Sequence, residues 1–247
     1  MRLAGINLAW KSDSNTTAVA IGDLEGGILS VRRIEKQLSV EELKGLIREE
    51  NTIAGVAVDA PLIITNTQGQ RLCDKCLSKH YARQNASCYP GNLTLCGTRS
   101  PDFSAYLSRH GFEHLCKPSE GRFQIECYPH PAMIEIFELP ERLKYKKGCV
   151  SLRRKGQMNL SQLVLALRRS RVMSLQIEGE WQKYVNAGHI ASLVGIALKA
   201  NEDVLDAVVC LYVAALFATS VPHKVYGSLE SGYIYVPTQK CIGSADR

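Results

Sequence analysis

Residues 53–59 read IAGVAVD, an uninterrupted run of small and β-branched apolar side chains that ends in a carboxylate. Such a run is typical of a parallel strand that helices cover on both faces. Pro61 follows it, and proline cannot continue the ladder of a central strand. Because ligands in open α/β sheets bind just beyond the carboxyl ends of strands, Asp59 is the first candidate site residue.

Three strands and one helix are expected upstream of this run. Apolar or alternating stretches predict strands at 2–9, 16–22 and 28–34, with short connections that suit a meander. Ser39 and Glu42 form a capping box, which predicts the start of a helix. The resulting order β-β-β-α-β predicts a mixed sheet flanked by helices, which is an α/β fold.

The chain downstream divides into an insertion and a mainly helical half. Residues 63–121 contain five cysteines and no clear period, so we interpret them as a Cys-rich, loop-rich insertion. We interpret residues 1–247 as a single domain that carries this insertion. The remaining elements are predicted as strands at 123–127 and 232–236 and helices at 132–139, 160–170, 191–199 and 201–219.

The composition narrows the class of protein. The 247 residues carry a net charge of +6, which permits nucleic acid or phosphorylated ligands without requiring them. No apolar run approaches the about 20 residues that a membrane span needs, so we expect no membrane partner. Nine cysteines, an odd number, and no leader-like N-terminus favour reduced thiols and a cytoplasmic location.

Three further carboxylates are candidates for chemistry. Asp203 and Asp206 are three residues apart in the predicted helix, so they share one face. Acids at a helix start also suit the macrodipole, which is the structural alternative for both. Glu126 lies in a predicted strand, where a charge needs a partner because unpaired burial is costly. Convergent carboxylates are what Mg²⁺ or Mn²⁺ needs to activate water at a phosphodiester.

The motifs, taken in order, resemble the DUF429 family, which is similar to the RNase H-like superfamily in expected fold. The resemblance implies an RNase H-like sheet and a nuclease-like activity. The segments that carry it are GINLAW (5–10), VAVDAPL (56–62), RLCDKCL (71–77), IECYPHP (125–131), EDVLDAVVCLYVA (202–214) and YGSLESGYIYVP (226–237).

Within that superfamily, the pattern of Holliday-junction resolvases is the most similar. These enzymes carry one acid on the first strand, one on the fourth strand and an Asp-x-x-Asp pair on a late helix. The fourth-strand position matches Asp59, and the pair matches Asp203 and Asp206. The first-strand position matches Asn7, which offers a neutral carbonyl oxygen in place of a carboxylate.

The resemblance therefore implies a metal-dependent phosphodiesterase that acts on nucleic acid. In this hypothesis Asp59, Glu126, Asp203 and Asp206 are catalytic, and Asn7, Asp59 and Asp206 bind Mg²⁺ or Mn²⁺. Because Asn7 weakens the site, either Glu126 supplies the missing carboxylate, or one weakly held metal suffices, or the protein binds nucleic acid without cutting it. An ordinary hydrogen-bonded role for Asn7 at a strand end is the structural alternative.

A third hypothesis for the function comes from the ATP-binding phosphotransferases, which share this superfamily fold. Their phosphate loops are Gly-rich turns between the first two strands. Residues 10–15 here contain no glycine, which counts against a close backbone cradle, although Lys11, Ser12 and Ser14 could meet a phosphate.

The cysteines of the insertion suggest a structural zinc site. Cys73 and Cys76 have the spacing of half such a site, and Cys88 and Cys96 could complete four thiolates. The second pair lacks the Cys-x-x-Cys spacing, so the alternative is that these cysteines are unpaired and act as small hydrophobes.

The positive charge is concentrated in one segment. Residues 141–171 hold ten of the 30 Lys and Arg residues and a single acid, Glu141. Such a density of charge favours salt-dependent contact with nucleic-acid phosphates, whereas a solvated surface is the structural alternative. The candidate nucleic-acid-binding residues are Lys144, Lys146, Lys147, Arg153, Arg154 and Lys155.

Overall fold

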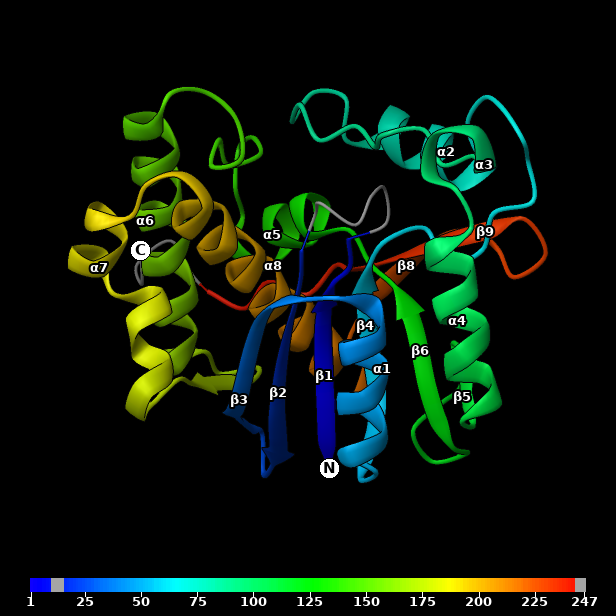
Figure 1. The fold of residues 1–247 in the computed structure, drawn as a ribbon, viewed down its shortest axis with the longest axis horizontal. Helices are drawn as coiled ribbons and strands as arrows, with labels where there is room; N and C mark the ends of the chain where they lie inside the picture. Colours follow the sequence, from blue (N-terminus) through cyan, green and yellow to red (C-terminus); the bar gives the residue numbers. More distant parts are fainter. Residues whose placement is uncertain (10–15, 243–247) are drawn as a thin grey trace.

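A seven-stranded sheet with the order β5-β6-β4-β1-β2-β3-β7 organises the chain (Figure 1). The computed structural model describes residues 1–9 and 16–242. A separate antiparallel pair is formed by β8 and β9. The strands are β1 (Arg2–Asn7), β2 (Thr17–Glu25), β3 (Ile28–Leu38), β4 (Ile53–Asp59), β5 (Phe112–His114), β6 (Arg122–Glu126), β7 (Ser174–Gln176), β8 (His223–Ser228) and β9 (Gly232–Pro237).

Strand directions confirm the predicted α/β fold, a mixed sheet with a β-β-β-α-β core. Strands β1, β2 and β3 form an antiparallel meander. Strand β4 pairs parallel with β1 on its other side, and β6 pairs parallel with β4. The carboxyl ends of β1, β4 and β6 therefore lie side by side at the same end of the sheet.

Helices cover both faces of the sheet (Figure 1). One apolar cluster joins the sheet to α1 and α4, and a larger one joins it to α5, α6 and α8. No helix within the described residues is long and apolar enough to cross a membrane. The helices are α1 (Val40–Glu49), α2 (Leu72–His80), α3 (Leu93–Cys96), α4 (Arg99–Arg109), α5 (Pro129–Phe137), α6 (Val150–Ala166), α7 (Ala187–Ser192) and α8 (Gly195–Ala218), with 3₁₀ turns at Leu167–Arg169 and Gly179–Val185.

Several predicted elements differ from the structure. Segment 63–121 is loop-rich only in part, because it contains α2, α3, α4 and β5. Helix α2 begins after Arg71, whose type is unusual for an N-cap and gives no sequence signal. The helices expected at 191–199 and 201–219 are instead a short α7 and one long α8. Helix α6 starts inside the basic segment, and β7 and β8 were not predicted.

Gly5 lets β1 lie directly on the backbone of α8. A Cβ atom at this position would lie 1.9 Å from the Leu211 nitrogen and 2.2 Å from the Ala207 carbonyl oxygen. No side chain larger than hydrogen fits there, since both neighbours are main-chain atoms that cannot rotate away. This contact determines how closely α8 packs against β1, and so where the residues of α8 lie relative to the end of that strand.

Replacing Gly5 with alanine is expected to destabilise the fold. Gly5→Ala should lower the free energy of unfolding by about 3 kcal/mol, because α8 must move off the sheet. Urea denaturation measures the change. Gly45→Ala is the matched control, since a Cβ at Gly45 on α1 meets nothing within 4 Å. That substitution should stabilise the protein by about 0.5–1 kcal/mol. Equal effects of the two substitutions would contradict the close contact.

Candidate functional site

Four of the predicted site residues come together at the carboxyl end of the sheet. Asn7 ends β1 and Asp59 ends β4, and the two are direct partners in the parallel ladder. Asp203 and Asp206 lie on α8, and Asp206 directly precedes Ala207, whose carbonyl oxygen touches the Gly5 position. Both are almost completely buried. The structure therefore brings these four candidate residues to one end of the sheet.

The Lys146 ammonium lies between two of the carboxylates. Its Nζ atom is 2.8 Å from Asp206 Oδ2 and 3.9 Å from Asp59 Oδ2. The hydroxyl of buried Tyr145 donates a 2.5 Å hydrogen bond to Asp206 Oδ1. Both oxygens of Asp206 are thus engaged, one by a neutral donor and one by a cation.

Asp203 has a different set of partners. Its Oδ1 atom accepts hydrogen bonds from Asn7 Nδ2 at 2.8 Å and from Lys199 Nζ at 2.7 Å. Its Oδ2 atom is buried and has no hydrogen-bond partner. The Asn7 amide therefore donates to the carboxylate beside it, as a strand-end hydrogen-bonding residue does. Glu202 is held separately, by Lys199 and Arg153.

Burial shifts the proton affinities of these groups. Burial raises the pKa of Asp59 to about 7, although the nearby Lys146 charge opposes the rise. Burial likewise raises the pKa of Asp203 to about 6, against the charge of Lys199. Burial alone would lower the pKa of Lys146, but Asp206, Tyr145 and Asp59 raise it well above its ordinary value. Lys146 is therefore a permanent cation at neutral pH.

Glu126 is committed to a different network. The Arg71 guanidinium donates to both of its oxygens, at 2.8 and 2.6 Å, and the Leu62 N–H adds a third bond of 2.8 Å. Arg71 also pairs with Asp74, which accepts from the Gly91 N–H. These buried contacts satisfy Glu126 and tie β6 to the insertion. Glu126 lines the same small cavity as Asp59, with both of its oxygens engaged by Arg71.

The four cysteines are not gathered at one point in the described part of the chain. Within residues 1–9 and 16–242, no group of three or more His, Cys, Asp or Glu side chains is arranged to hold a metal ion. Cys73 is buried in an apolar cluster with Leu77 and Tyr226, whereas Cys76 is exposed. Cys96 instead contacts the Pro90 carbonyl oxygen at 3.8 Å. Cys88 packs at the edge of the same cluster as Cys73, so the alternative of small hydrophobes describes both.

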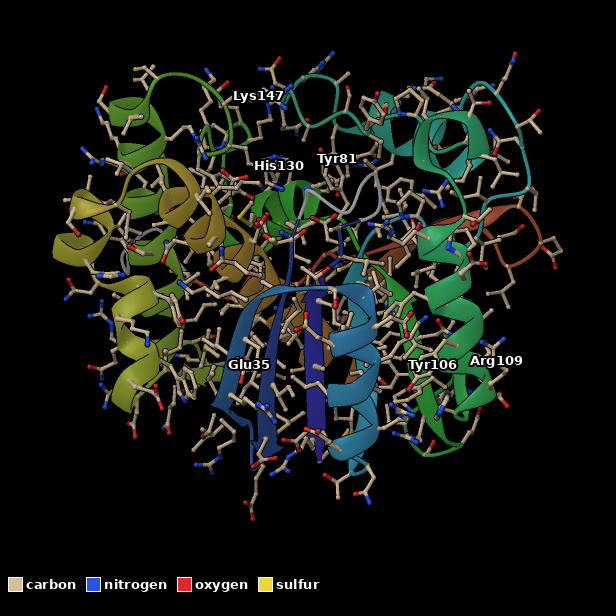
Figure 2. The ribbon with its side chains drawn as sticks, viewed as in Figure 1. Glu35, Tyr81, Tyr106, Arg109, His130 and Lys147 are labelled. Carbon is tan, nitrogen blue, oxygen red and sulfur yellow. The ribbon has the colours of Figure 1, made fainter. Side chains whose placement is uncertain are left out.

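A groove of about 1120 Å³ leads to the carboxylates. Its walls are residues 87–90 of the insertion and residues 139–148 before α6. In Figure 2, Lys147 and His130 lie at this end of the molecule. Four of the predicted basic residues line the groove, namely Lys144, Lys146, Lys147 and Lys155. The other two are engaged elsewhere, since Arg153 pairs with Glu202 and Arg154 donates to the Leu193 carbonyl oxygen at 2.7 Å.

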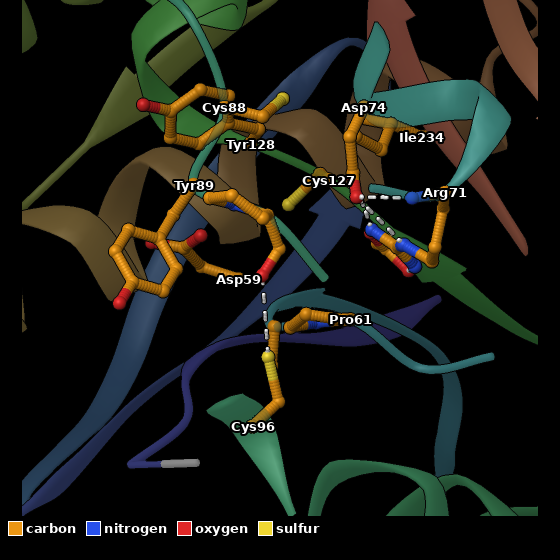
Figure 3. A pocket seen from close by; sticks show the side chains of 13 residues that line it. Asp59, Pro61, Arg71, Asp74, Cys88, Tyr89, Cys96, Cys127, Tyr128 and Ile234 are labelled. Atoms are coloured by element: carbon orange, nitrogen blue, oxygen red, sulfur yellow. Dashed lines mark hydrogen bonds and ion pairs between the residues drawn. The ribbon is translucent and has the colours of Figure 1, made fainter. Parts of the chain in front are cut away.

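A smaller cavity of about 100 Å³ continues the groove to Asp59 (Figure 3). It shares Tyr89 and Tyr128 with the groove, so the two spaces adjoin. On its far side lie Arg71 and Asp74, which close it toward the insertion. The Asp59 carboxylate therefore lines a cavity that adjoins the groove.

His130 lies beneath the groove as a neutral ring. It is buried, its Nδ1 atom has no partner, and its ring meets those of Tyr128 and Tyr145 edge-on. Burial and the positive charges of Lys146 and Arg142 lower its pKa well below the ordinary value. His130 therefore supports Tyr145 without adding charge.

Three site residues escaped the sequence reasoning: Arg71, Tyr145 and Lys199. Lys199 stands four residues before Asp203, a spacing that places the two on one helix face and was available as a signal. Tyr145 and Arg71 reach the carboxylates only through the tertiary fold. Neither could be found from spacing along the chain.

The donor set fits one hard divalent cation. Mg²⁺ is commonly held by one or two carboxylates, with waters and substrate phosphates completing its shell. Asp59 and Asp206 approach a single cationic atom. Among the described residues, no third His, Cys, Asp or Glu side chain joins them in a group arranged to hold a metal ion. An ion at this point would replace the Lys146 ammonium.

The family model described as "Protein of unknown function (DUF429)" matches residues 12–225. No curated protein sequence matches the chain significantly. Among solved structures, the Thermus thermophilus RuvC structure aligns with 89% of this chain and 96% of that chain, at 9% identity and a TM-score of 0.36.

The raised pKa of Asp59 predicts a dependence of stability on pH. The folded protein holds this proton up to about pH 7, whereas the unfolded chain releases it near the ordinary value of 3.8. Between these values the folded state binds more protons, so Asp59 makes the protein less stable as pH rises. Asp59→Asn should therefore stabilise the protein relative to wild type by an amount that grows from pH 5 to pH 8.

Urea denaturation with a chelator present, at pH 5 and pH 8, measures this difference. Asp23→Asn is the control, because Arg2 and Arg32 lower the pKa of Asp23 below 3.8. Its effect should be the same at both pH values. A pH-independent effect of Asp59→Asn would show that Asp59 is ionised throughout.

Proposed function

The chain belongs to the DUF429 family, as its motifs predict, and from this premise we propose that it is a divalent-metal-dependent phosphodiesterase acting on nucleic acid. The family description assigns no activity, so the proposal rests on the site. One observation carries it: the Asp59 and Asp206 carboxylates converge on one cation position at the inner end of a lysine-lined groove.

Asp59 and Asp206 would hold the metal. A bound Mg²⁺ or Mn²⁺ would supply a Lewis acid for a phosphate oxygen and lower the pKa of bound water. Tyr145 fixes the orientation of Asp206 through its 2.5 Å hydrogen bond. Partners of this kind hold metal ligands in place and raise their affinity.

Asp203 is the candidate proton acceptor. Its Oδ1 atom is fixed by Asn7 and Lys199, which leaves Oδ2 unpartnered. With a pKa of about 6, the group takes up a proton close to neutral pH. A general base works best when its pKa lies near the operating pH. Asp203 Oδ2 would accept the proton of a water molecule at the phosphate.

The groove would bind the phosphate backbone. Lys144, Lys147 and Lys155 are exposed along it, and each would neutralise a phosphate on one strand. Such contacts are independent of base sequence and weaken as salt increases. This arrangement supports nucleic acid as the class of substrate.

A second candidate function is binding of nucleic acid without cleavage. Two observations favour it: Asn7 stands where related folds carry an acid, and lysines already neutralise Asp206 and Asp203. Under this alternative the groove binds nucleic acid in a salt-dependent manner and no strand is cut. The ATP-binding alternative depended on residues 10–15, which lie outside the described residues.

Loss of one carboxylate distinguishes the two candidates. We expect wild-type protein with Mn²⁺ to cleave at least one of branched, duplex or single-stranded oligonucleotides. Asp206→Asn should reduce the rate by more than about 100-fold, because even an outer partner of a metal ligand costs about 10–100-fold. The asparagine side chain can still accept the Tyr145 hydrogen bond, so the fold should be retained.

Asp102→Asn serves as the control, since Asp102 is an exposed carboxylate on α4. It should cleave like wild type. Salt-sensitive binding by wild type with no cleavage of any of the three substrates would support the second candidate. Undiminished cleavage by Asp206→Asn would assign the activity to another site.

A further inference from the structure

Lys146 holds the position at which the proposed metal would bind. Its ammonium contacts Asp206 Oδ2 at 2.8 Å and Asp59 Oδ2 at 3.9 Å. We propose that Lys146 is a built-in competitor of the metal, which is displaced when a divalent ion binds and then contacts a phosphate in the groove. This inference rests on the metal site of the proposed function and adds a way of coupling metal to substrate.

Ammonium and metal cannot occupy the site together. Tyr145 already engages Asp206 Oδ1, so Oδ2 is the oxygen that remains for a cation. The Lys146 ammonium uses that oxygen. Two like charges sharing one carboxylate oxygen repel each other strongly at such short range. A metal ion at Asp59 and Asp206 therefore requires the ammonium to leave.

The structure allows Lys146 to leave without moving its backbone. The preceding Tyr145 is buried, and its Cα lies so close to Gly156 on α6 that a Cβ there would be 2.6 Å away. This packing anchors the segment. The Lys146 side chain itself is 27% exposed and lines the groove, and its flexible four-carbon stem can rotate outward. Displacement is then a change of rotamer.

The groove offers a displaced ammonium one carboxylate, Glu141, which already pairs with Lys144 at 3.3 Å, and it has space for a phosphate. Residues Lys144, Lys147 and Lys155 surround the same space, so an additional cation there is unfavourable until a polyanion enters. A phosphate in the groove therefore favours dissociation of the Lys146 ammonium from the Asp206 carboxylate. Metal and nucleic acid should each increase the affinity for the other.

Lys199 is the second lysine that contacts these carboxylates, and its contacts differ from those of Lys146. It contacts Asp203 Oδ1 and Glu202, and its side chain is half exposed. Asp203 Oδ2 stays unpartnered beside it. Lys199 thus neutralises charge without using the oxygen that remains available, whereas Lys146 uses it.

Mn²⁺ affinity tests the competition directly. Electron paramagnetic resonance measures free Mn²⁺ in titrations of wild type, Lys146→Gln and Lys117→Gln, with no nucleic acid present. Lys146→Gln should bind Mn²⁺ about tenfold more tightly, a coupling of ordinary size for two ligands that exclude each other. Lys117→Gln removes the same charge from an exposed pair with Glu120 and should bind like wild type.

A second measurement uses the wild-type protein alone. Acetylation of lysines by an activated ester, followed by mass spectrometry, reports how accessible each ammonium is. Mn²⁺ should increase the acetylation rate of Lys146 several-fold and leave that of Lys117 unchanged. This result does not depend on the folding of a variant.

Unchanged or weaker Mn²⁺ binding by Lys146→Gln, or no Mn²⁺ effect on Lys146 acetylation, would overturn the inference. The result for Mn²⁺ binding can be distinguished from the result for cleavage of nucleic acid. Tighter binding by Lys146→Gln without cleavage by any form would retain the competition and refute the phosphodiesterase. Cleavage by wild type without tighter binding would do the reverse.

Discussion

Strand β1 and helix α8 meet backbone to backbone at Gly5, and the position of every site residue on α8 follows from that contact. A Cβ atom at Gly5 would lie 1.9 Å from the Leu211 nitrogen. Asp206 and Asp203 lie one and two turns before Leu211, which brings them to the end of β1 and β4. If α8 stood further from the sheet, Asp206 and Asp59 would not share a cation.

Close packing of carboxylates creates a charge problem that the chain solves with lysines. Asp59, Asp203 and Asp206 lie in a poorly solvated site, where an ionised group without a partner is costly. Lys146 and Lys199 supply the opposite charge, and Tyr145 and Asn7 supply neutral hydrogen bonds. In the proposed function, the same groups that neutralise these carboxylates would also control whether a metal ion can enter.

The fold and the carboxylate cluster were predictable because each depends on local pattern and strand order. The apolar run ending at Asp59 and the meander before it are properties of short segments, and parallel strands bring their ends together. The role of Lys146 was not predictable in this way. The charge pattern made Lys146 a candidate for phosphate contact, but its contact with Asp206 spans 60 residues of sequence and depends on how Tyr145 packs on α6. The partner of Glu126 was not predictable for a similar reason, since Arg71 comes from the insertion.

The central claim is that one point between Asp59 and Asp206 binds either the Lys146 ammonium or a divalent ion. Crystals of the wild-type protein soaked in Mn²⁺ and measured at the manganese absorption edge test it most directly. We expect an anomalous peak between the two carboxylates, with the Lys146 side chain turned into the groove. Lys146 still bridging Asp59 and Asp206 at saturating Mn²⁺, with no peak between them, would contradict the claim.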